Sequence, residues 1–178
     1  MSGRLEGRKV AVLLAEGFED LEFWVTVMRL REEGAHVSIA GLEAKTAVRG
    51  KNGLMAEAEI SVHDVSADAL DAIVVPGGWA PDKLRRYEAV KELVRDAHDG
   101  GKIVGLICHA GLVGISAGIV AGGRATGSLG IKDDLVNAGA TWVDEPAFRD
   151  GNIVWGRVVE DIPDFCAELV AAIESTPR

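Results

Sequence analysis

The stretch Lys102-Ile-Val-Gly-Leu-Ile-Cys-His-Ala-Gly-Leu-Val-Gly-Ile-Ser-Ala-Gly118 decides the fold class of this chain. Residues 103–107 are apolar and β-prone, and beyond Cys108 apolar residues recur at the helical spacing Leu112, Ile115 and Ile119. Cys108 therefore lies where a buried strand turns directly into a helix. The free N–H groups and positive dipole end of a helix N-terminus favour a thiolate, which is the nucleophilic form of cysteine. We expect a lowered pKa and a nucleophilic role for Cys108.

Small residues on both sides of Cys108 permit a tight turn, which resembles the strand–nucleophile–helix elbow of hydrolases. Ala110 supplies the small residue two positions after the cysteine, whereas Leu106 occupies the position two before it, so the match is loose. The alternative is that Cys108 is a small buried hydrophobe, as lone cysteines often are. Cys166 lies mid-helix among apolar neighbours, and we expect it to be structural.

Outward from this stretch, short apolar runs alternate with amphipathic segments. We expect strands over 9–15, 36–40, 72–75 and 103–107, and helices over 19–33, 88–98, 131–137 and 164–173. The first helix should turn Leu21, Trp24, Val25, Met28 and Leu30 inward. An antiparallel excursion is expected within 45–62, a brief strand over 124–126, and a hairpin or two adjacent strands from 141–144 and 152–158. The order of these elements predicts one domain over 1–178, with a flexible N-terminus over 1–8. Its predicted architecture is a three-layer α/β/α sandwich with a flavodoxin-like, mostly parallel sheet.

Three polar segments should meet at the carboxyl edge of this sheet, where ligands bind in such folds. They are residues 16–19, 76–78 and 108–109. A carboxylate should lie beside Cys108, but the spacing alone does not choose between Glu16 and Glu19. The alternative is that these acidic residues only complement the dipole at the start of the helix. The amides of Gly77, Gly78 and His109 could form an oxyanion hole, the alternative being a plain Pro-Gly turn.

Composition and charge exclude several functional classes. The chain has 178 residues, 48% of them hydrophobic and 26% charged, and a net charge of −9, which argues against nucleic acid or an anionic membrane as a partner. Two cysteines form no disulfide framework or zinc motif, and no apolar run approaches the ~18 residues of a membrane span. We expect a cytoplasmic protein without a metal.

The positions of the histidines and glycines exclude two kinds of site, a glutamine-amidotransferase triad and a phosphate-binding loop. No histidine follows His109, so a Cys-His-Glu triad of the glutamine-amidotransferase kind is excluded, and His109 is the best base or thiolate partner. No phosphate-binding glycine loop follows the predicted strands, so we expect no cofactor.

Several motifs in order resemble the ThiJ/PfpI superfamily, which has a class I glutamine amidotransferase-like fold, and specifically its PfpI-like intracellular protease/glyoxalase branch. They span nearly the whole chain: 16–22 (EGFEDLE), 74–82 (VVPGGWAPD), 105–111 (GLICHAG), 115–118 (ISAG), 131–144 (IKDDLVNAGATWVD) and 150–152 (DGN). The chain departs from the family at His109-Ala110-Gly111, where Cys-His-Gly-Pro is usual. Residues 127–129 and 155–157 also differ from the family pattern, and by resemblance they border the pocket.

The resemblance implies a role for each matched residue. Cys108 is the nucleophile, His109 its neighbouring histidine, Glu19 the glutamate that hydrogen-bonds the cysteine, and Gly77 and Gly78 the oxyanion-hole glycines. Asp82 matches the acidic residue that completes a triad with the histidine of a neighbouring subunit in oligomeric peptidases. Family members form dimers or larger rings such as hexamers, so the resemblance implies a homo-oligomer.

We therefore expect a cofactor-independent glyoxalase or deglycase-like hydrolase that uses Cys108 against small reactive aldehydes such as methylglyoxal. The first alternative is an intracellular cysteine peptidase that is active as an oligomer and uses Cys108, His109 and Asp82 on peptides. The second alternative is an oxidative-stress sensor or chaperone based on a low-pKa cysteine.

Overall fold

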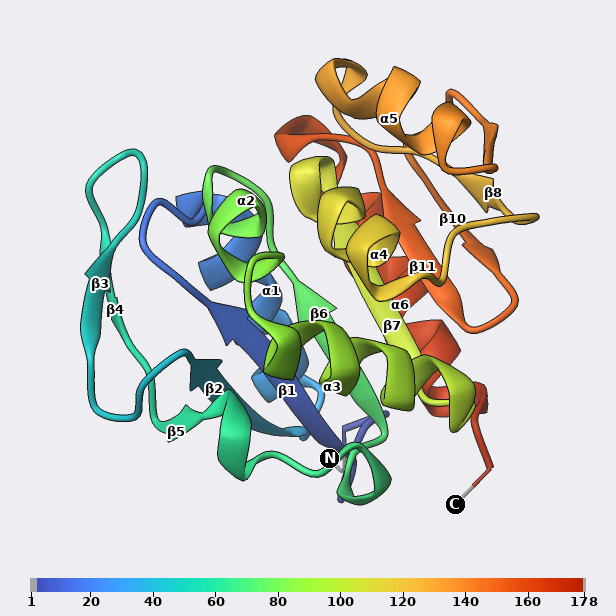
Figure 1. Ribbon diagram of the computed structural model, residues 1–178. Helices are drawn as coiled ribbons and strands as arrows, with labels where there is room; N and C mark the ends of the chain where they lie inside the picture. Colours follow the sequence, from blue (N-terminus) through green and yellow to red (C-terminus); the bar gives the residue numbers. More distant parts are fainter. Residues whose placement is uncertain (1–2, 178) are drawn as a thin grey trace.

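A seven-stranded, mostly parallel sheet forms the centre of the molecule (Figure 1). The computed structural model describes residues 3–177. The strand order is β10-β11-β7-β6-β1-β2-β5, and only β10 runs antiparallel to its neighbour. The strands of this sheet are β1 Lys9–Leu14, β2 His36–Gly41, β5 Ile60–Ser61, β6 Ala72–Val75, β7 Ile103–Ile107, β10 Ala147–Asp150 and β11 Ile153–Gly156.

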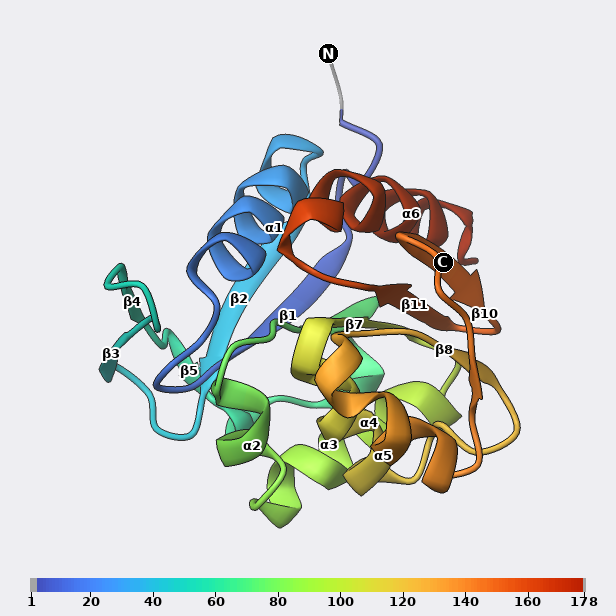
Figure 2. The same ribbon diagram turned by 90° about the horizontal axis from the view of Figure 1, so that it is seen from above.

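Helices cover both faces of the sheet and make three layers. Figure 2 shows α1 and α6 on one face and α2, α3, α4 and α5 on the other. The helices are α1 Asp20–Glu32, α2 Ala80–Leu84, α3 Glu88–Asp99, α4 Gly111–Ala117, α5 Lys132–Asn137 and α6 Ile162–Ser175. The central strands β6 and β7 are buried at every position, because helices pack on both of their faces. This architecture confirms the predicted α/β/α sandwich and flavodoxin-like sheet.

Two small sheets lie outside the central one. The antiparallel pair β3 Ala47–Arg49 and β4 Met55–Glu57 is the predicted excursion, and its tip is residues 50–54. The strand predicted over 124–126 is β8 Arg124–Ala125, and it pairs in parallel with β9 Thr141–Trp142. The hairpin partner of β11 is therefore β10, not the segment 141–144 that we predicted. The turn between β10 and β11 contains Gly151, which has a φ of 60°.

Helix α1 turns a different face inward from the one that we predicted. Leu30 is buried as predicted, but Leu21, Val25 and Met28 are 49%, 39% and 61% exposed, and Glu22 and Thr26 are buried instead. Apolar residues occur around almost the whole circumference of α1, so their spacing does not single out one face. The sheet and α6 decide the orientation instead, and the consequence is that Glu22 points into the protein.

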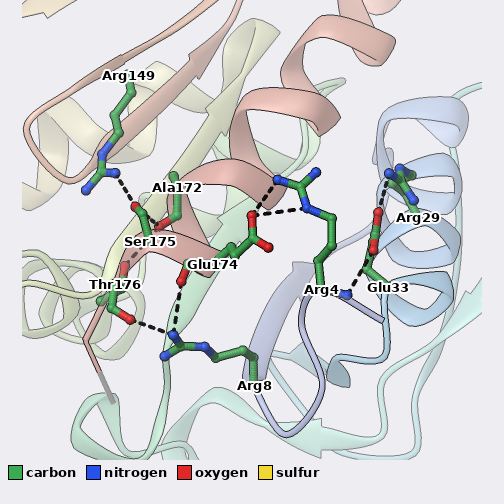
Figure 3. Close-up of polar contacts among 9 residues, drawn as sticks. All are labelled: Arg4, Arg8, Arg29, Glu33, Arg149, Ala172, Glu174, Ser175 and Thr176. Carbon is green, nitrogen blue, oxygen red and sulfur yellow. Dashed lines mark hydrogen bonds and ion pairs between the residues drawn. The ribbon is translucent and has the colours of Figure 1, made fainter. Parts of the chain in front are cut away.

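Residues 3–8 are packed against the protein rather than flexible, which corrects our prediction for 1–8; residues 1 and 2 lie outside the described residues. Leu5 is fully buried, and Arg8 pairs with Asp71 at 2.8 Å. Figure 3 shows Arg4 and Arg8 holding the end of α6, through a bond from Arg4 Nε to Glu174 Oε2 (3.1 Å) and one from Arg8 Nη2 to the carbonyl of Thr176 (2.5 Å).

No helix within residues 3–177 combines the length and the apolar character that a membrane span requires.

Candidate active site

The backbone of Cys108 adopts a conformation that non-glycine residues rarely occupy. Strand β7 ends at Ile107, Cys108 has a φ of 60°, and a short 3-10 turn over Cys108–Ala110 leads into α4. A left-handed residue other than glycine costs about 1–2 kcal/mol, and such strain is concentrated at functional sites. The amide of Ser128 donates to the Cys108 carbonyl at 3.1 Å and helps to hold this turn. The predicted elbow is therefore present, with a half-buried thiol at its apex.

The carboxylate beside Cys108 belongs to Glu22, not to Glu19 or Glu16. Glu22 is 1% exposed, and its charge and hydrogen-bonding capacity act directly on the Cys108 thiol. The amide of Gly77 donates to Glu22 Oε2 at 2.7 Å. A Cβ placed on Gly77 would overlap this carboxylate and lie 2.8 Å from Cβ of Cys108, so a glycine is required between the two groups. Oε1 of Glu22 has no other hydrogen-bond donor among residues 3–177, so the Cys108 thiol is the group that this carboxylate can accept from and deprotonate.

Glu19, which the resemblance placed against the cysteine, instead caps α1. Its Oε2 accepts from the amide of Glu22 at 2.8 Å, and its Oε1 accepts from Asn52 Nδ2 at 3.1 Å. Glu16 lies on the exposed side, where its Oε2 accepts from the amide of Arg49 at 2.9 Å. Glu19 and Glu22 differ in this way because a residue at the N-cap points back to the helix amides, whereas a residue in the first turn can point into the protein.

Burial sets the protonation of the Glu22–Cys108 pair. Loss of solvent, and then the nearby charge of Glu19, raise the pKa of Glu22 to about 7. Burial and the Glu22 carboxylate raise the pKa of Cys108 to about 12, whereas the amides of His109 and Gly78 act to lower it. The expectation of a lowered thiol pKa is thus wrong, because the effect of two backbone N–H groups is smaller than that of burial beside a carboxylate. The resting pair is a thiol next to a carboxyl group that titrates near neutral pH.

His109 is the second polar neighbour of the thiol, as predicted. Its Nδ1 lies 3.3 Å from Cys108 Sγ. Burial and, secondly, the charge of Lys51 lower the pKa of His109, so the imidazole is neutral at pH 7. The irregular backbone of the elbow allows these adjacent side chains to meet.

Gly77 and Gly78 have different tasks. The amide of Gly77 is already bonded to Glu22, so it is not available to an oxyanion. The amides of Gly78 and His109 face the Cys108 sulfur and remain as the pair of donors that a developing negative charge would meet. Gly78 has a φ of 79°, and its close approach to the backbone of Gly17 leaves no room for a side chain.

A hollow of about 340 Å³ opens over the histidine. Its lining contains Gly78 and His109, as predicted, together with Asp82. Asp82 forms an ion pair with Arg86 one turn further along the chain, so within one protomer it does not complete a triad with His109. The remaining lining residues, which the sequence did not single out, are Lys51, Trp79 and Leu112.

Two signals in the sequence could have identified Glu22 and Lys51. Glu22 is spaced four residues from Thr26 and eight from Leu30, which share the buried face of α1, and a carboxylate on a buried face needs a partner. Lys51 lies between two glycines, Gly50 and Gly53, at the tip of the predicted excursion, where side chains often contribute to sites.

Cys166 is buried and lies 3.8 Å from Thr26 Oγ1, in a structural position as expected. Among residues 3–177, no group of three or more His, Cys, Asp or Glu side chains is arranged to bind a metal ion.

Comparison with known proteins identifies the family. The model of the DJ-1/PfpI family matches residues 8–172. This chain belongs to the DJ-1/PfpI family. Deglycase PfpI of Pyrococcus furiosus is 38% identical over 93% of this chain and 99% of its own length. YraA of Bacillus subtilis, named as a candidate cysteine protease, is 35% identical over 90% of this chain and 95% of its own length.

A solved structure agrees with this assignment. The two-domain protein from Anabaena variabilis, which contains DJ-1/ThiJ/PfpI-like and ferritin-like domains, superposes with a TM-score of 0.91 at 34% identity. The match covers 92% of this chain and 47% of that longer one. Membership in the DJ-1/PfpI family confirms the resemblance that the sequence motifs indicated, and the names of the relatives support an enzymatic activity of DJ-1/PfpI type.

Proposed function

We propose that this protein is a cysteine-dependent glyoxalase or deglycase-like hydrolase of small reactive aldehydes such as methylglyoxal. The observation that carries the proposal is the pairing of a strained, half-buried Cys108 with a buried Glu22 whose pKa is raised to about 7. A base with a pKa near the working pH is the best compromise between being ionised and being able to hold a proton. The hollow of about 340 Å³, lined by His109 and Gly78 next to the thiol, suits a small substrate.

In the first step, ionised Glu22 accepts the proton of the Cys108 thiol while the sulfur adds to the aldehyde carbon. The carbonyl π electrons move to oxygen, and the amides of Gly78 and His109 stabilise that oxyanion. The product is a hemithioacetal once the oxygen takes up a proton, which Glu22 can return.

In the second step, neutral His109 removes the proton from the former aldehyde carbon, and the electron pair forms a C=C bond while the ketone π electrons move to oxygen. Protonated His109 then returns the proton to the neighbouring carbon, and the hydroxyl proton of the carbon bonded to sulfur passes to the former ketone oxygen. The carbon bonded to sulfur becomes a thioester, and water cleaves it to release a 2-hydroxy acid and the free thiol. Each group is thereby restored to its starting state. The deglycase names of the Pyrococcus relatives support a deglycase-like activity.

Replacement of the nucleophile tests the proposal. Cys108→Ala and Cys108→Ser should reduce methylglyoxal consumption at least about 100-fold, because the nucleophile is lost and the other cysteine, Cys166, is buried beside Thr26. Cys166→Ala is the matched control, and it should leave turnover within a factor of about two. Turnover by Cys108→Ala equal to that of the wild type would remove Cys108 from the mechanism.

A cysteine peptidase is the second candidate, and Asp82 is the observation that favours it. Asp82 lines the same hollow as His109, and YraA bears a protease name. If this candidate holds, casein hydrolysis should be present in an oligomer and be lost in Asp82→Ala, because the acidic residue comes from another protomer. Peptidase activity from a monomer would contradict it. The sensor hypothesis stays a prediction, and oxidation of Cys108 ahead of Cys166 under mild peroxide, followed by mass spectrometry, would support it.

A further inference from the structure

We propose that Lys51 selects substrates with a carboxylate, so that the preferred substrate of the Cys108 site is an anionic 2-oxoaldehyde rather than a neutral one. This inference names a substrate class and, for turnover, rests on the proposed function. It starts from the position of Lys51, which lines the hollow together with Gly78, Trp79 and His109.

The loop that carries Lys51 is held in place by hydrogen bonds to residues at the start of α1. Both carboxylate oxygens of buried Asp20 accept loop amides, from Asn52 at 2.8 Å and from Leu54 at 2.7 Å. The amide of Lys51 itself donates to the carbonyl of Phe18 at 2.9 Å. The tip of the β3–β4 hairpin is thus tied to the start of α1, and the Lys51 stem begins at a defined point beside the hollow.

The charge of Lys51 is available to a ligand. Lys51 is exposed and forms no ion pair within residues 3–177. Its field reaches the reacting groups, because it lowers the pKa values of both His109 and Glu22. Because Lys51 and His109 line the same hollow, the charge of Lys51 also acts on a substrate that is bound there.

The negative groups around the hollow are already engaged. Asp82 pairs with Arg86, and Glu19 accepts from the Glu22 amide and from Asn52. Glu22 is buried behind the thiol and is half neutral near pH 7. In a protein of net charge −9, which repels anions at long range, one unpaired cation at the site decides whether an anion is accepted there.

Alkylation of Cys108 tests the charge preference without reference to turnover. In this reaction the sulfur displaces iodide from a methylene carbon, either of iodoacetate, which carries a carboxylate, or of neutral iodoacetamide. The ratio of the two rate constants, followed by mass spectrometry of the Cys108 peptide, cancels any change in thiol reactivity. Lys51→Gln should lower the iodoacetate-to-iodoacetamide ratio about 5-fold, as expected for loss of one nearby charge interaction.

Lys9→Gln is the matched control. Lys9 is exposed at the amino end of β1, whereas the site lies at the carboxyl ends of the strands, and its loss changes the net charge equally. It should leave the ratio unchanged, and added salt should reduce the ratio in the wild type but not in Lys51→Gln. An equal ratio in the wild type and Lys51→Gln would overturn the proposal.

Turnover of 4-carboxyphenylglyoxal against phenylglyoxal then tests the substrate class. The wild type should favour the carboxylated compound in kcat/KM, Lys51→Gln should lose the preference, and Lys51→Glu should reverse it. If neither compound is consumed while the alkylation ratio still depends on Lys51, the proposed function fails and the anion site stands. If both are consumed with no dependence on Lys51, the anion site fails and the proposed function stands.

Discussion

At the scale of single residues, the properties of Cys108 come from its neighbours more than from its position at a helix start. The amides of His109 and Gly78 favour a thiolate, but burial and the Glu22 carboxylate raise the pKa of the thiol to about 12. The same burial makes Glu22 a weaker acid, with a pKa of about 7. One proton is therefore shared between a thiol and a carboxylate, and its transfer to Glu22 during attack generates the nucleophile.

The raised pKa of Glu22 predicts how stability depends on pH. Between the pKa of an unfolded glutamate, about 4.3, and the folded value of about 7, the folded protein binds more protons than the unfolded chain. The contribution of Glu22 to the free energy of unfolding should therefore be greatest below about pH 4, fall as pH rises and level off above about pH 7. The total loss is on the order of 4 kcal/mol, because the folded and unfolded pKa values differ by about 2.7 and Glu22, at 1% exposed, is little screened by solvent.

Urea unfolding of the wild type and Glu22→Gln from pH 4 to 8 measures this effect. The difference in stability between the two proteins should shift in favour of Glu22→Gln as pH rises, because the amide has no charge to bury. A difference that stays constant over the whole pH range would show that Glu22 ionises as readily in the folded protein as in the unfolded chain.

At the scale of elements, the site is assembled from three chain segments that meet at one sheet edge. Strand β7 presents Cys108, the turn after β6 presents Gly77 and Gly78, and the start of α1 presents Glu22. The amide of Glu19 donates to the Gly77 carbonyl at 3.0 Å, and the amide of Trp79 donates to the Gly17 carbonyl at 2.8 Å. These backbone bonds join the turn after β6 to the start of α1 and so set the spacing between Glu22 and the thiol.

Gly78→Ala should disturb this junction more than an alanine at another left-handed glycine. Gly78 and Gly101 have φ values of 79° and 72°, so both substitutions incur the left-handed cost of about 1 kcal/mol. A Cβ at Gly78 also collides with the backbone of residues 17–19, whereas a Cβ at Gly101 meets nothing within 4 Å. We expect Gly78→Ala to cost at least about 2 kcal/mol more in guanidinium unfolding, and equal costs would contradict the proposed close approach.

Prediction from sequence succeeded where one physical requirement dominated. Continuous apolar runs such as residues 72–75 and 103–107 are typical of parallel strands covered on both faces, and they led to the correct sheet. The face of α1 was not predictable in this way, because Leu21, Val25 and Met28 form an apolar stripe that is exposed in the protomer. The pairing of β10 with β11 could not be predicted either, because the local sequence of such short strands does not specify which strand lies next to them.

The site was predicted in part for similar reasons. Cys108, His109 and the glycines follow from the ends of strands, which parallel topology brings together. Glu22 and Glu19 are both acidic residues at a helix start, and only the packing of α1 separates a cap from a buried base. Lys51 reaches the site through the β3–β4 hairpin, whose position against α1 is set by Asp20 rather than by local pattern.

At the scale of the whole molecule, we predict a homo-oligomer, which the resemblance implied and the surface of α1 supports. Leu21, Val25 and Met28 recur on one side of the helix and are 49%, 39% and 61% exposed. Water contact with such a stripe is unfavourable, and burial of it against a second copy removes that cost. Sedimentation velocity at micromolar concentration should give a mass at least twice the 18.8 kDa of the chain.

The charge variant Met28→Glu should lower that mass, whereas Glu168→Gln, an exposed change on α6, should not. A wild-type mass of 18.8 kDa across the concentration range would contradict the prediction.

Activation of Cys108 by Glu22 should be visible in the pH dependence of kcat/KM for methylglyoxal loss. The wild type should gain activity with pH and reach a plateau above about pH 7, because ionised Glu22 is the base. Glu22→Gln should lose at least about 100-fold and the rising limb with it. Glu19→Gln should keep the limb but shift it to lower pH, since the charge of Glu19 raises the pKa of Glu22. A rising limb centred near the ordinary thiol pKa of about 8.5, unchanged in Glu22→Gln, would contradict the account.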